Sequence, residues 1–313
     1  MSVTTNIDWN LAIQLVKACI QSQNAFHDGK DDDPAKCNPP SPPITPCMPP
    51  PLSPQSPDGY NRIGCFTGVN TLLQLRRVEC FGLVYHSTKD DSYIFSFRGS
   101  KSQLDWIEDF EFSQQVSFVP FFSDARPKVP QGARVAHGFW SIYTTSYTDS
   151  QASTQSMQQQ LFNLLNQYQP KKLYITGHSL GAALCELFTL DVALSKYGNI
   201  EYYNYNYGCP MVGNEDFANI YDAQPREKQT PTLRVRNIND IVPDLPRSGE
   251  GYRQVGQEYL IDFHAKYADP NPACRLLDNH MAQNYAPVLL CASTSSNGVC
   301  VNDNVAVPWP TCA

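Results

Sequence analysis

Apolar and polar residues alternate along this chain with two spacings, one typical of helices and one typical of strands. Between residues 8 and 26, apolar side chains recur about every four positions, which predicts an amphipathic helix. Two short apolar runs, at 80–87 and 92–99, flank a polar turn and predict a β-hairpin. The first third of the chain therefore contains both kinds of element.

The same alternation continues through the rest of the chain. A stripe of apolar residues between 154 and 168 predicts a second long helix, which Pro170 ends. Further strands are predicted at 173–176, 201–208, 232–237 and 258–263, with a short helix at 217–221. Because strands alternate with helices around one buried strand, we expect a single α/β domain over residues 1–313.

One segment departs from this pattern. Residues 31–59 hold almost half of the chain's 25 prolines, so they cannot form a helix or a central strand. We expect an extended, polyproline-like insertion into the domain. It is interpreted either as a ligand for a proline-binding module or, as we favour, as a surface insertion closed by a Cys37–Cys47 disulfide.

Residues 100–112 predict a short amphipathic helix. Leu104, Ile107 and Phe110 fall near helical spacing with Trp106 alongside, and acidic residues occupy the other side. A strongly apolar run, VSFVPFF, follows at 116–122. Both segments have two interpretations. Either they pack on the core, or they form a lid and an apolar rim over a site that binds apolar molecules.

Size and charge narrow the class of protein. With 313 residues, 42% of them hydrophobic, the chain can build one large α/β domain or two small ones. The net charge is −7 and no basic block occurs, which argues against nucleic acid partners and against charge-driven binding to anionic membranes. No run of 18 apolar residues is present, so no transmembrane helix is expected.

The 11 cysteines give conflicting indications of compartment. Such a number favours an oxidising compartment and secretion, whereas residues 1–21 lack the features of a signal peptide and favour the cytoplasm. No C-x-x-C motif occurs, so neither a zinc site nor a thioredoxin-like site is expected. We interpret Cys185 and Cys209 as buried free thiols. Candidates for disulfides are Cys37 with Cys47 and Cys291 with Cys300, with Cys312 nearby.

The chemistry of the chain is concentrated at 171–184, where an apolar strand leads into G-x-S-x-G and then an Ala/Leu-rich helix. This is the pattern of a nucleophile elbow, a sharp turn that projects the central Ser179 above the sheet. Gly177 and Gly181 are required because side chains there would collide with neighbouring backbone. The alternative interpretation is a serine that only caps the helix.

A serine hydroxyl needs a base, and the base needs an orienting carboxylate. In elbow hydrolases these follow the serine in the order acid, then histidine. Only His264 and His280 follow Ser179, and Asp240 and Asp244 both lie in a loop after a predicted strand. Spacing alone leaves both choices open.

The chain resembles the class 3 lipase family, which includes fungal triacylglycerol lipases. The resemblance rests on segments in family order and spacing between residues 79 and 286. They are 97–100, 105–106, 138–139, 177–181, 210–214, 239–243 and 279–280. It implies an α/β-hydrolase-type fold, with a central, mostly parallel sheet, flanking helices and a short helical lid.

The resemblance also assigns site residues. It implies that Ser179, Asp240 and His280 form a catalytic triad, and that Ser100 and Leu180 form the oxyanion hole. It places the lid at 101–112, and the lid and substrate-binding residues are Leu104, Trp106, Ile107 and Phe110. No metal or cofactor is implied, and His178 is interpreted as a packing residue.

The function expected from this resemblance is a lipase or esterase that hydrolyses acylglycerol esters through an acyl-enzyme. Its substrate lies at a lipid–water interface, which implies peripheral contact with membranes or lipid droplets. Alternatives on the same scaffold are a phospholipase A1 or galactolipase, a feruloyl-type esterase and an acyltransferase. A non-catalytic, lipase-like interaction protein is a further alternative, which the intact Ser–Asp–His order disfavours.

Overall fold

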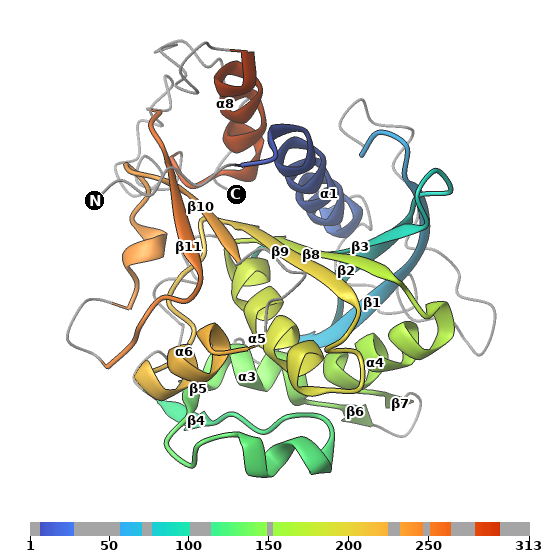
Figure 1. Cartoon of the computed structure of the whole chain (residues 1–313), viewed down its shortest axis with the longest axis vertical. Coiled ribbons are helices and arrows are strands. Elements are labelled where there is room, and N and C mark those ends of the chain that lie inside the picture. Colours follow the sequence, from blue (N-terminus) through green and yellow to red (C-terminus); the bar gives the residue numbers. More distant parts are fainter. Residues whose placement is uncertain are drawn as a thin grey trace.

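A seven-stranded sheet forms the centre of the molecule in the computed structural model (Figure 1). The model describes residues 7–27, 57–70, 77–100, 114–148, 153–224, 232–246, 251–263 and 279–294. The strands, in the order in which they lie side by side, are β1 (Asn61–Asn70), β2 (Arg77–His86), β3 (Ser92–Phe97), β8 (Lys172–His178), β9 (Glu201–Tyr207), β10 (Leu233–Asn237) and β11 (Gln257–Ile261).

Strand direction divides the sheet into two parts. The predicted hairpin is present, because β2 and β3 pair antiparallel, and β1 pairs antiparallel with β2. From β3 to β11 every neighbouring pair is parallel. The expectation of a mostly parallel sheet with flanking helices is therefore confirmed, and the carboxyl ends of five strands lie along one edge.

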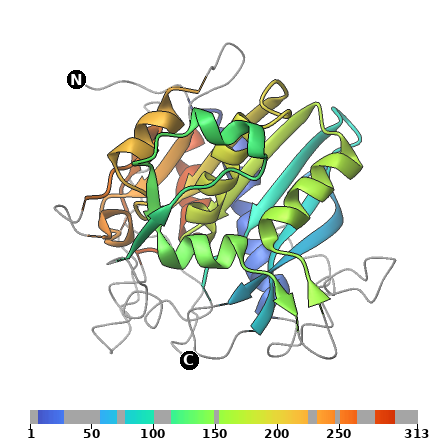
Figure 2. The same ribbon diagram turned by 90° about the horizontal axis from the view of Figure 1, so that it is seen from below.

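Helices cover both faces of the sheet (Figures 1 and 2). One face carries α1 (Trp9–His27) and α8 (Ala282–Thr294), which contact each other. The opposite face carries α3 (His137–Thr144), α4 (Met157–Tyr168), α5 (Leu180–Leu194) and α6 (Glu215–Asp222). Two layers of apolar side chains fill these interfaces, one around α5 and the other under α1. Burial of these layers is the main driving force for the fold.

Short elements complete the described residues. They are the two-stranded sheets β4 (Gln115–Ser117) with β5 (Arg134–Ala136) and β6 (Tyr147–Thr148) with β7 (Ser153–Thr154), and the 3-10 helices η2 (Ser123–Lys128) and η3 (Val242–Asp244). Among all the described residues, no helix is both long enough and apolar enough to cross a membrane.

The second long predicted helix shows how local sequence sets its limits. It begins at Met157 because Ser156 and Gln159 form a capping box, in which each side chain bonds the other residue's backbone N–H. It ends at Tyr168 because Gln169 adopts a left-handed conformation with φ 48° before Pro170.

The edge strand β1 is absent from the sequence-based prediction. Its sequence, NRIGCFTGVN, contains polar residues and two glycines, and it has no run of apolar residues. Gly68 is used where α4 packs closely, because an added Cβ would lie 2.6 Å from Cε of Met157. The strand therefore depends on tertiary packing against α4 and not on its own strand propensity.

Two predicted features lie outside the described residues. The first is the proline-rich insertion, of which residues 31–56 are not described. The second is the predicted lid at 101–112, with Leu104, Trp106, Ile107 and Phe110. The apolar run 116–122 is described, and it packs on the core. The ring of Phe118 meets that of Phe217 at 5.6 Å, and the ring of Phe121 stacks on that of Phe162 at 4.5 Å.

The cysteines within the described residues separate into two groups. Cys185 and Cys209 are buried free thiols, as predicted, and Cys19, Cys65 and Cys80 are also buried thiols. Cys291 is disulfide-bonded, which agrees with its selection as a disulfide candidate.

Candidate active site

Ser179 stands at the turn between β8 and α5 in a strained conformation. Its φ of 59° and ψ of −126° are unusual for a residue other than glycine. The turn is possible only with glycines on both sides. An added Cβ at Gly177 would lie 2.3 Å from the carbonyl oxygen of Gly181, and one at Gly181 would lie 2.5 Å from that of Arg98. The hydroxyl makes no capping hydrogen bond, which contradicts the capping interpretation.

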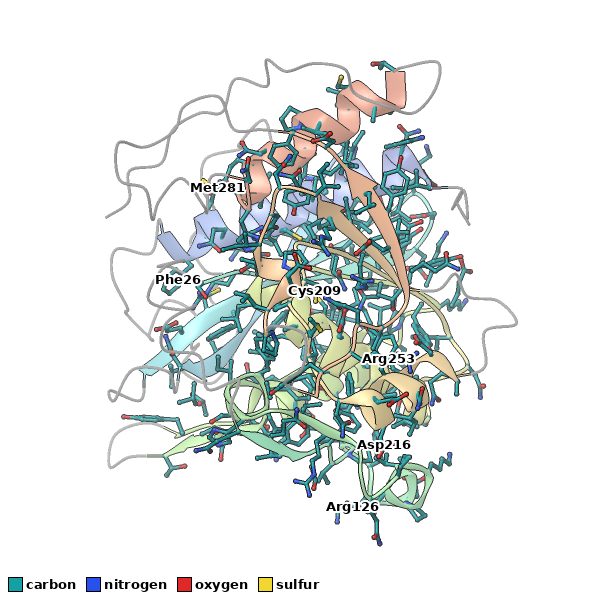
Figure 3. All side chains as sticks on the ribbon, turned by 90° about the vertical axis from the view of Figure 1, so that its left-hand side faces the viewer. Phe26, Arg126, Cys209, Asp216, Arg253 and Met281 are labelled. Carbon is teal, nitrogen blue, oxygen red and sulfur yellow. The ribbon has the colours of Figure 1, made fainter. Side chains whose placement is uncertain are left out.

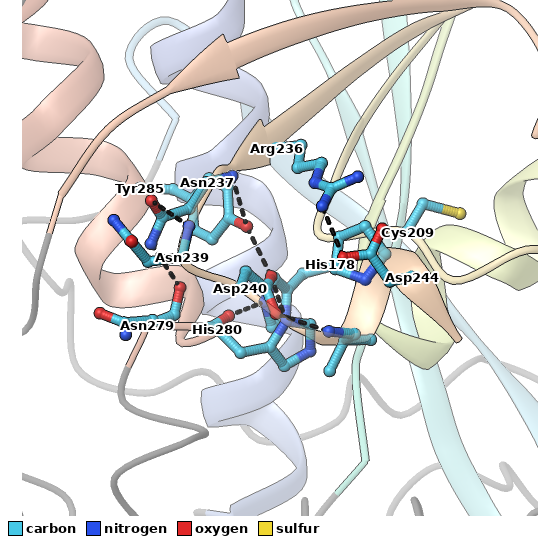
Figure 4. Close-up of polar contacts among 12 residues, drawn as sticks. His178, Cys209, Arg236, Asn237, Asn239, Asp240, Asp244, Asn279, His280 and Tyr285 are labelled. Atoms are coloured by element: carbon cyan, nitrogen blue, oxygen red, sulfur yellow. Dashed lines mark hydrogen bonds and ion pairs between the residues drawn. The ribbon is translucent and has the colours of Figure 1, made fainter. Parts of the chain in front are cut away.

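Asp240 and His280 are in direct contact, although 40 positions separate them (Figure 4). Nδ1 of His280 lies 2.7 Å from Oδ2 of Asp240, and both residues are 1% exposed. Because the carboxylate can only accept, Nδ1 carries the hydrogen and Nε2 presents a lone pair. Within the described part of the chain this Nε2 is buried and has no hydrogen-bond partner.

The neighbouring aspartate occupies a different environment. Asp244 lies at the surface, where its carboxylate pairs with Arg236 at 2.6 Å. Asp240 is buried, and its Oδ1 accepts the backbone N–H of Val242 at 2.9 Å. The structure therefore brings Asp240 and not Asp244 to a histidine. The alternative histidine, His264, lies outside the described residues.

Ser100 and Leu180 both lie next to the elbow, Leu180 directly after Ser179 in the chain and Ser100 directly after Gly99. Leu180 is the first residue of α5, and the first N–H groups of a helix have no intrahelical partner. Ser100 follows β3, and its hydroxyl is buried and unpartnered within the described residues. The intervening Gly99 lies against the elbow, because an added Cβ there would be 3.4 Å from Cβ of Ser179. Unpaired donors are thus available next to the serine.

Arg98 holds the Ser100 loop in place. Its guanidinium is buried, forms an ion pair with Glu79 and donates to the carbonyl oxygen of Gly99 at 2.7 Å. It also lies over the rings of Phe26 and Phe81, at 3.8 and 4.3 Å from their centroids. A buried pair with this many contacts fixes geometry more than it adds stability.

Helix α1 also reaches this loop. The side-chain amide of Gln23 donates to the carbonyl oxygen of Ser100 at 3.1 Å. The preceding residue, Ser22, donates to the carbonyl oxygen of Ser96 at 3.1 Å. The N-terminal helix thus supports the end of β3 from the face of the sheet opposite α5.

Three residues of the site were missed or incompletely described by sequence reasoning. Tyr285 donates its hydroxyl to Oδ2 of Asp240 at 2.9 Å. Gly208 has φ 57°, and an added Cβ would lie 2.8 Å from Cε1 of His280. His178 packs, as predicted, but its Nε2 also lies 2.5 Å from the carbonyl oxygen of His280. No local motif marks these residues, since each contacts a segment distant in sequence.

A buried acidic group lies behind the elbow, inside the molecule. Glu186, on α5, is fully buried near Cys209, whose thiol donates to Oε1 at 3.3 Å; Figure 3 marks Cys209 within the interior. Burial raises the pKa of Glu186 to about 8, because the charged form is poorly solvated there. Within the described residues, no cluster of three or more His, Cys, Asp or Glu side chains is arranged to hold a metal ion.

The family model for class 3 lipases matches residues 94–249. The chain belongs to the class 3 lipase family, and its sheet, elbow and flanking helices are those of an α/β-hydrolase-type fold.

Two of its relatives are plant proteins. Phospholipase A1-II 1 of Oryza sativa subsp. indica is 31% identical over 176 residues, and Phospholipase A1-IIgamma of Arabidopsis thaliana is 30% identical over 184 residues.

These matches are partial. Each covers 54% of this chain and 42% or 41% of the relative, so the chain spans about two fifths of the curated relatives it matches. Solved structures agree in fold over a greater length. The Rhizomucor miehei triacylglyceride lipase has a TM-score of 0.56 at 23% identity, covering 83% of this chain and 82% of that one. The triacylglycerol lipase from Penicillium expansum has a TM-score of 0.52 at 18% identity, covering 82% of each chain.

Proposed function

We propose that this chain hydrolyses carboxylic esters of lipids, with Ser179 as nucleophile, His280 as general base and Asp240 as the acid that orients it. The observation that carries the proposal is the 2.7 Å contact between the buried Asp240 and His280 beside a strained serine turn. A buried carboxylate facing an imidazole whose other nitrogen is unpartnered is the arrangement that a serine hydrolase requires.

The proposed reaction begins with proton transfer. Nε2 of His280 takes the hydroxyl proton of Ser179 while the serine oxygen attacks the ester carbonyl carbon. Asp240 stabilises the imidazolium that forms and keeps the hydrogen on Nδ1. His280 then gives the proton to the leaving alcohol. Water, deprotonated by the same nitrogen, cleaves the acyl-enzyme and restores Ser179.

Charge on the carbonyl oxygen needs stabilisation in both steps. We assign this role to the backbone N–H of Leu180 together with the backbone N–H and hydroxyl of Ser100. Support comes from their position beside the elbow and from the position of Leu180 at the amino end of α5, where the helix dipole favours negative charge. Each such donor contributes about 3–4 kcal/mol to transition-state stabilisation.

The proposed substrates are acylglycerol esters at a lipid–water interface, and the proposed lid and substrate-binding residues are Leu104, Trp106, Ile107 and Phe110. A second candidate, phospholipase A1 activity, is favoured by the names of the plant relatives, which share about 30% identity over 54% of this chain. The structures named as triacylglycerol lipases share the fold at lower identity. The two candidates differ in head group and not in mechanism.

The test compares wild type with Ser179→Ala on p-nitrophenyl esters of short and long chains, a triglyceride emulsion and phospholipid vesicles. We expect the variant to lose at least a thousandfold in kcat on every substrate that wild type cleaves, because the nucleophile is removed. Asp240→Asn should be strongly impaired. Asp244→Asn, four positions along the same loop, is the matched control and should keep near wild-type activity.

Each outcome has a distinct meaning. Equal activity of Ser179→Ala and wild type would disprove the elbow mechanism. Cleavage of phospholipid alone would select phospholipase A1, and cleavage of short-chain p-nitrophenyl esters alone would favour the esterase alternative. An inactive wild type that nevertheless binds lipid or protein partners would favour the non-catalytic alternative.

A further inference from the structure

Two histidine rings pack against each other, and one of them belongs to the residue before the proposed nucleophile. His178 is the last residue of β8 and directly precedes Ser179. Its ring lies against that of His280, with centroids 4.5 Å apart and planes inclined by 36°. Its Nε2 lies 2.5 Å from the carbonyl oxygen of His280, and Figure 4 shows both rings beside Asp240. One residue thus contacts both the ring and the backbone of the proposed base.

The partner of His178 determines where its hydrogen lies. A carbonyl oxygen can only accept, so Nε2 of His178 must carry the hydrogen and donate it. Burial, together with the neighbouring His280, lowers the pKa of His178 well below its ordinary value. His178 is therefore neutral across the physiological range. A neutral ring does not oppose a positive charge on the ring beside it, whereas a charged one would.

The segment that carries His280 is held from two directions. From β10, the amide of Asn237 donates to the carbonyl oxygen of Asn279 at 3.0 Å. From β8, His178 donates to the carbonyl oxygen of the next residue, His280. Because His178 adjoins Ser179 in the chain, its hydrogen bond links nucleophile and base through very few rotatable bonds. Within the described part of the chain, the other titratable groups that contact this pair are Asp240, in the loop after β10, and Tyr285, on α8.

We propose that His178 is a positioning residue, which sets the imidazole of His280 against Ser179 by donating its Nε2 hydrogen to the His280 carbonyl oxygen. This inference rests on the proposed function. Its consequence is kinetic: loss of the donor lets the base drift from the serine hydroxyl, which slows proton transfer without weakening substrate binding. A displacement of about 1 Å is sufficient to cost roughly a hundredfold in rate.

The test uses two replacements that separate the donor from the packing. His178→Gln places an amide N–H near the position of Nε2 and sacrifices the ring. His178→Phe keeps an aromatic ring, slightly larger than the imidazole, and removes the donor. We expect kcat of His178→Phe on a soluble p-nitrophenyl ester to fall roughly 10- to 100-fold with KM within threefold of wild type. His178→Gln should retain at least about a fifth of kcat.

A purely structural role predicts the reverse order, because phenylalanine fills the apolar space better than glutamine. If His178→Phe is as active as His178→Gln or more active, the proposal is wrong. It is also wrong if both folded variants match wild type or lose activity equally. The control pair is His86→Gln and His86→Phe, at a histidine on β2 that bonds Asp91 at the surface. Both should leave kcat and KM unchanged.

A measurement on unmodified protein decides the remaining cases. In wild type with 15N-labelled histidine, NMR at neutral pH should show a His178 ring whose hydrogen lies on Nε2 and resists exchange. A His178 ring that carries its hydrogen on Nδ1 would overturn the proposal even if both variants fail to fold. If Ser179→Ala is as active as wild type, the proposed function fails, and this spectrum still decides the role of His178.

Discussion

The hydroxyl of Tyr285 lies 2.9 Å from Oδ2 of Asp240, the same carboxylate oxygen that accepts the Nδ1 hydrogen of His280. Both side chains are buried, and burial raises the pKa of the Tyr285 phenol well above its ordinary value, so the phenol stays a donor. Asp240 therefore has three donors around its two oxygens, the third being the backbone N–H of Val242. Such a carboxylate is fixed in orientation before any substrate binds.

We expect Tyr285→Phe to lower both stability and activity. The free energy of unfolding should fall by about 1.5–3 kcal/mol, since a hydrogen bond to a charged group is lost. kcat should fall roughly three- to tenfold because the carboxylate that orients His280 is less constrained. Urea denaturation and kinetics on a p-nitrophenyl ester measure the two effects.

Tyr143→Phe is the matched control for that variant. Tyr143 is equally buried and donates to a buried carboxylate, Asp191, at 2.9 Å, away from the proposed active site. It should lose stability while keeping kcat. If the two variants lose kcat to the same degree, the Tyr285–Asp240 bond has no specific part in positioning the acid.

Gly208→Ala should abolish activity. At φ 57° any side chain is strained, and the new Cβ would lie 2.8 Å from Cε1 of His280 and 3.0 Å from Oδ2 of Asp240. The two side chains must move apart, and we expect kcat to fall at least about a hundredfold. Gly59→Ala provides the comparison, because Gly59 has φ 80° but its Cβ would have nothing within 4 Å. That variant should lose about 1 kcal/mol of stability and no activity.

Gln23→Leu tests whether α1 supports the Ser100 loop. The variant removes the amide that donates to the carbonyl oxygen of Ser100, so the proposed oxyanion donors would become less well placed. We expect kcat to fall about three- to tenfold with little change in KM. Gln14→Leu lies on the same helix and removes a bond to the exposed Asp58. Equal activity of both variants with wild type would limit α1 to a packing role.

Glu186→Gln should change the pH dependence of stability. Oε1 of Glu186 accepts from the amide of Asn206 at 3.3 Å, while Oε2 and the Asn206 Oδ1 are buried and unpartnered among the described residues. A buried Oε2 without a hydrogen-bond partner disfavours the charged carboxylate, because no donor replaces the water that would otherwise solvate it. Burial is the largest cause of the raised pKa, Arg234 opposes it, and Asp222 adds to it.

The direction in which stability changes with pH follows from the two pKa values of Glu186. The pKa of Glu186 is about 8 in the folded chain and 4.5 is its ordinary value, so the folded state binds the proton more tightly. Its contribution to stability is complete below about pH 4.5 and is lost as the pH rises to about 8. Urea denaturation from pH 5 to pH 8 should show wild type losing up to roughly 1.4 kcal/mol per pH unit relative to Glu186→Gln. Parallel profiles for the two proteins would contradict this account.

The elements that the sequence predicted well are those defined by local interactions. The helix ending at Tyr168 follows from its capping box and from Pro170. The elbow follows from two glycines that any strand–turn–helix of this tightness requires. The strand β1 could not be predicted in this way, since its glycines and polar residues are stabilised by neighbours far along the chain.

The sequence by itself therefore determined the fold class, the family and the serine at the elbow, because these depend on spacing and on backbone geometry over a few residues. Spacing left Asp240 and Asp244 open and the family resemblance pointed to Asp240, but only the tertiary structure shows their environments. Asp240 is buried against His280, and Asp244 pairs with Arg236 at the surface. The tertiary structure alone placed Tyr285, Gly208 and His178 around Asp240 and His280. Contacts between segments 40 or more positions apart depend on how strands stack in the sheet, and no local pattern records that order.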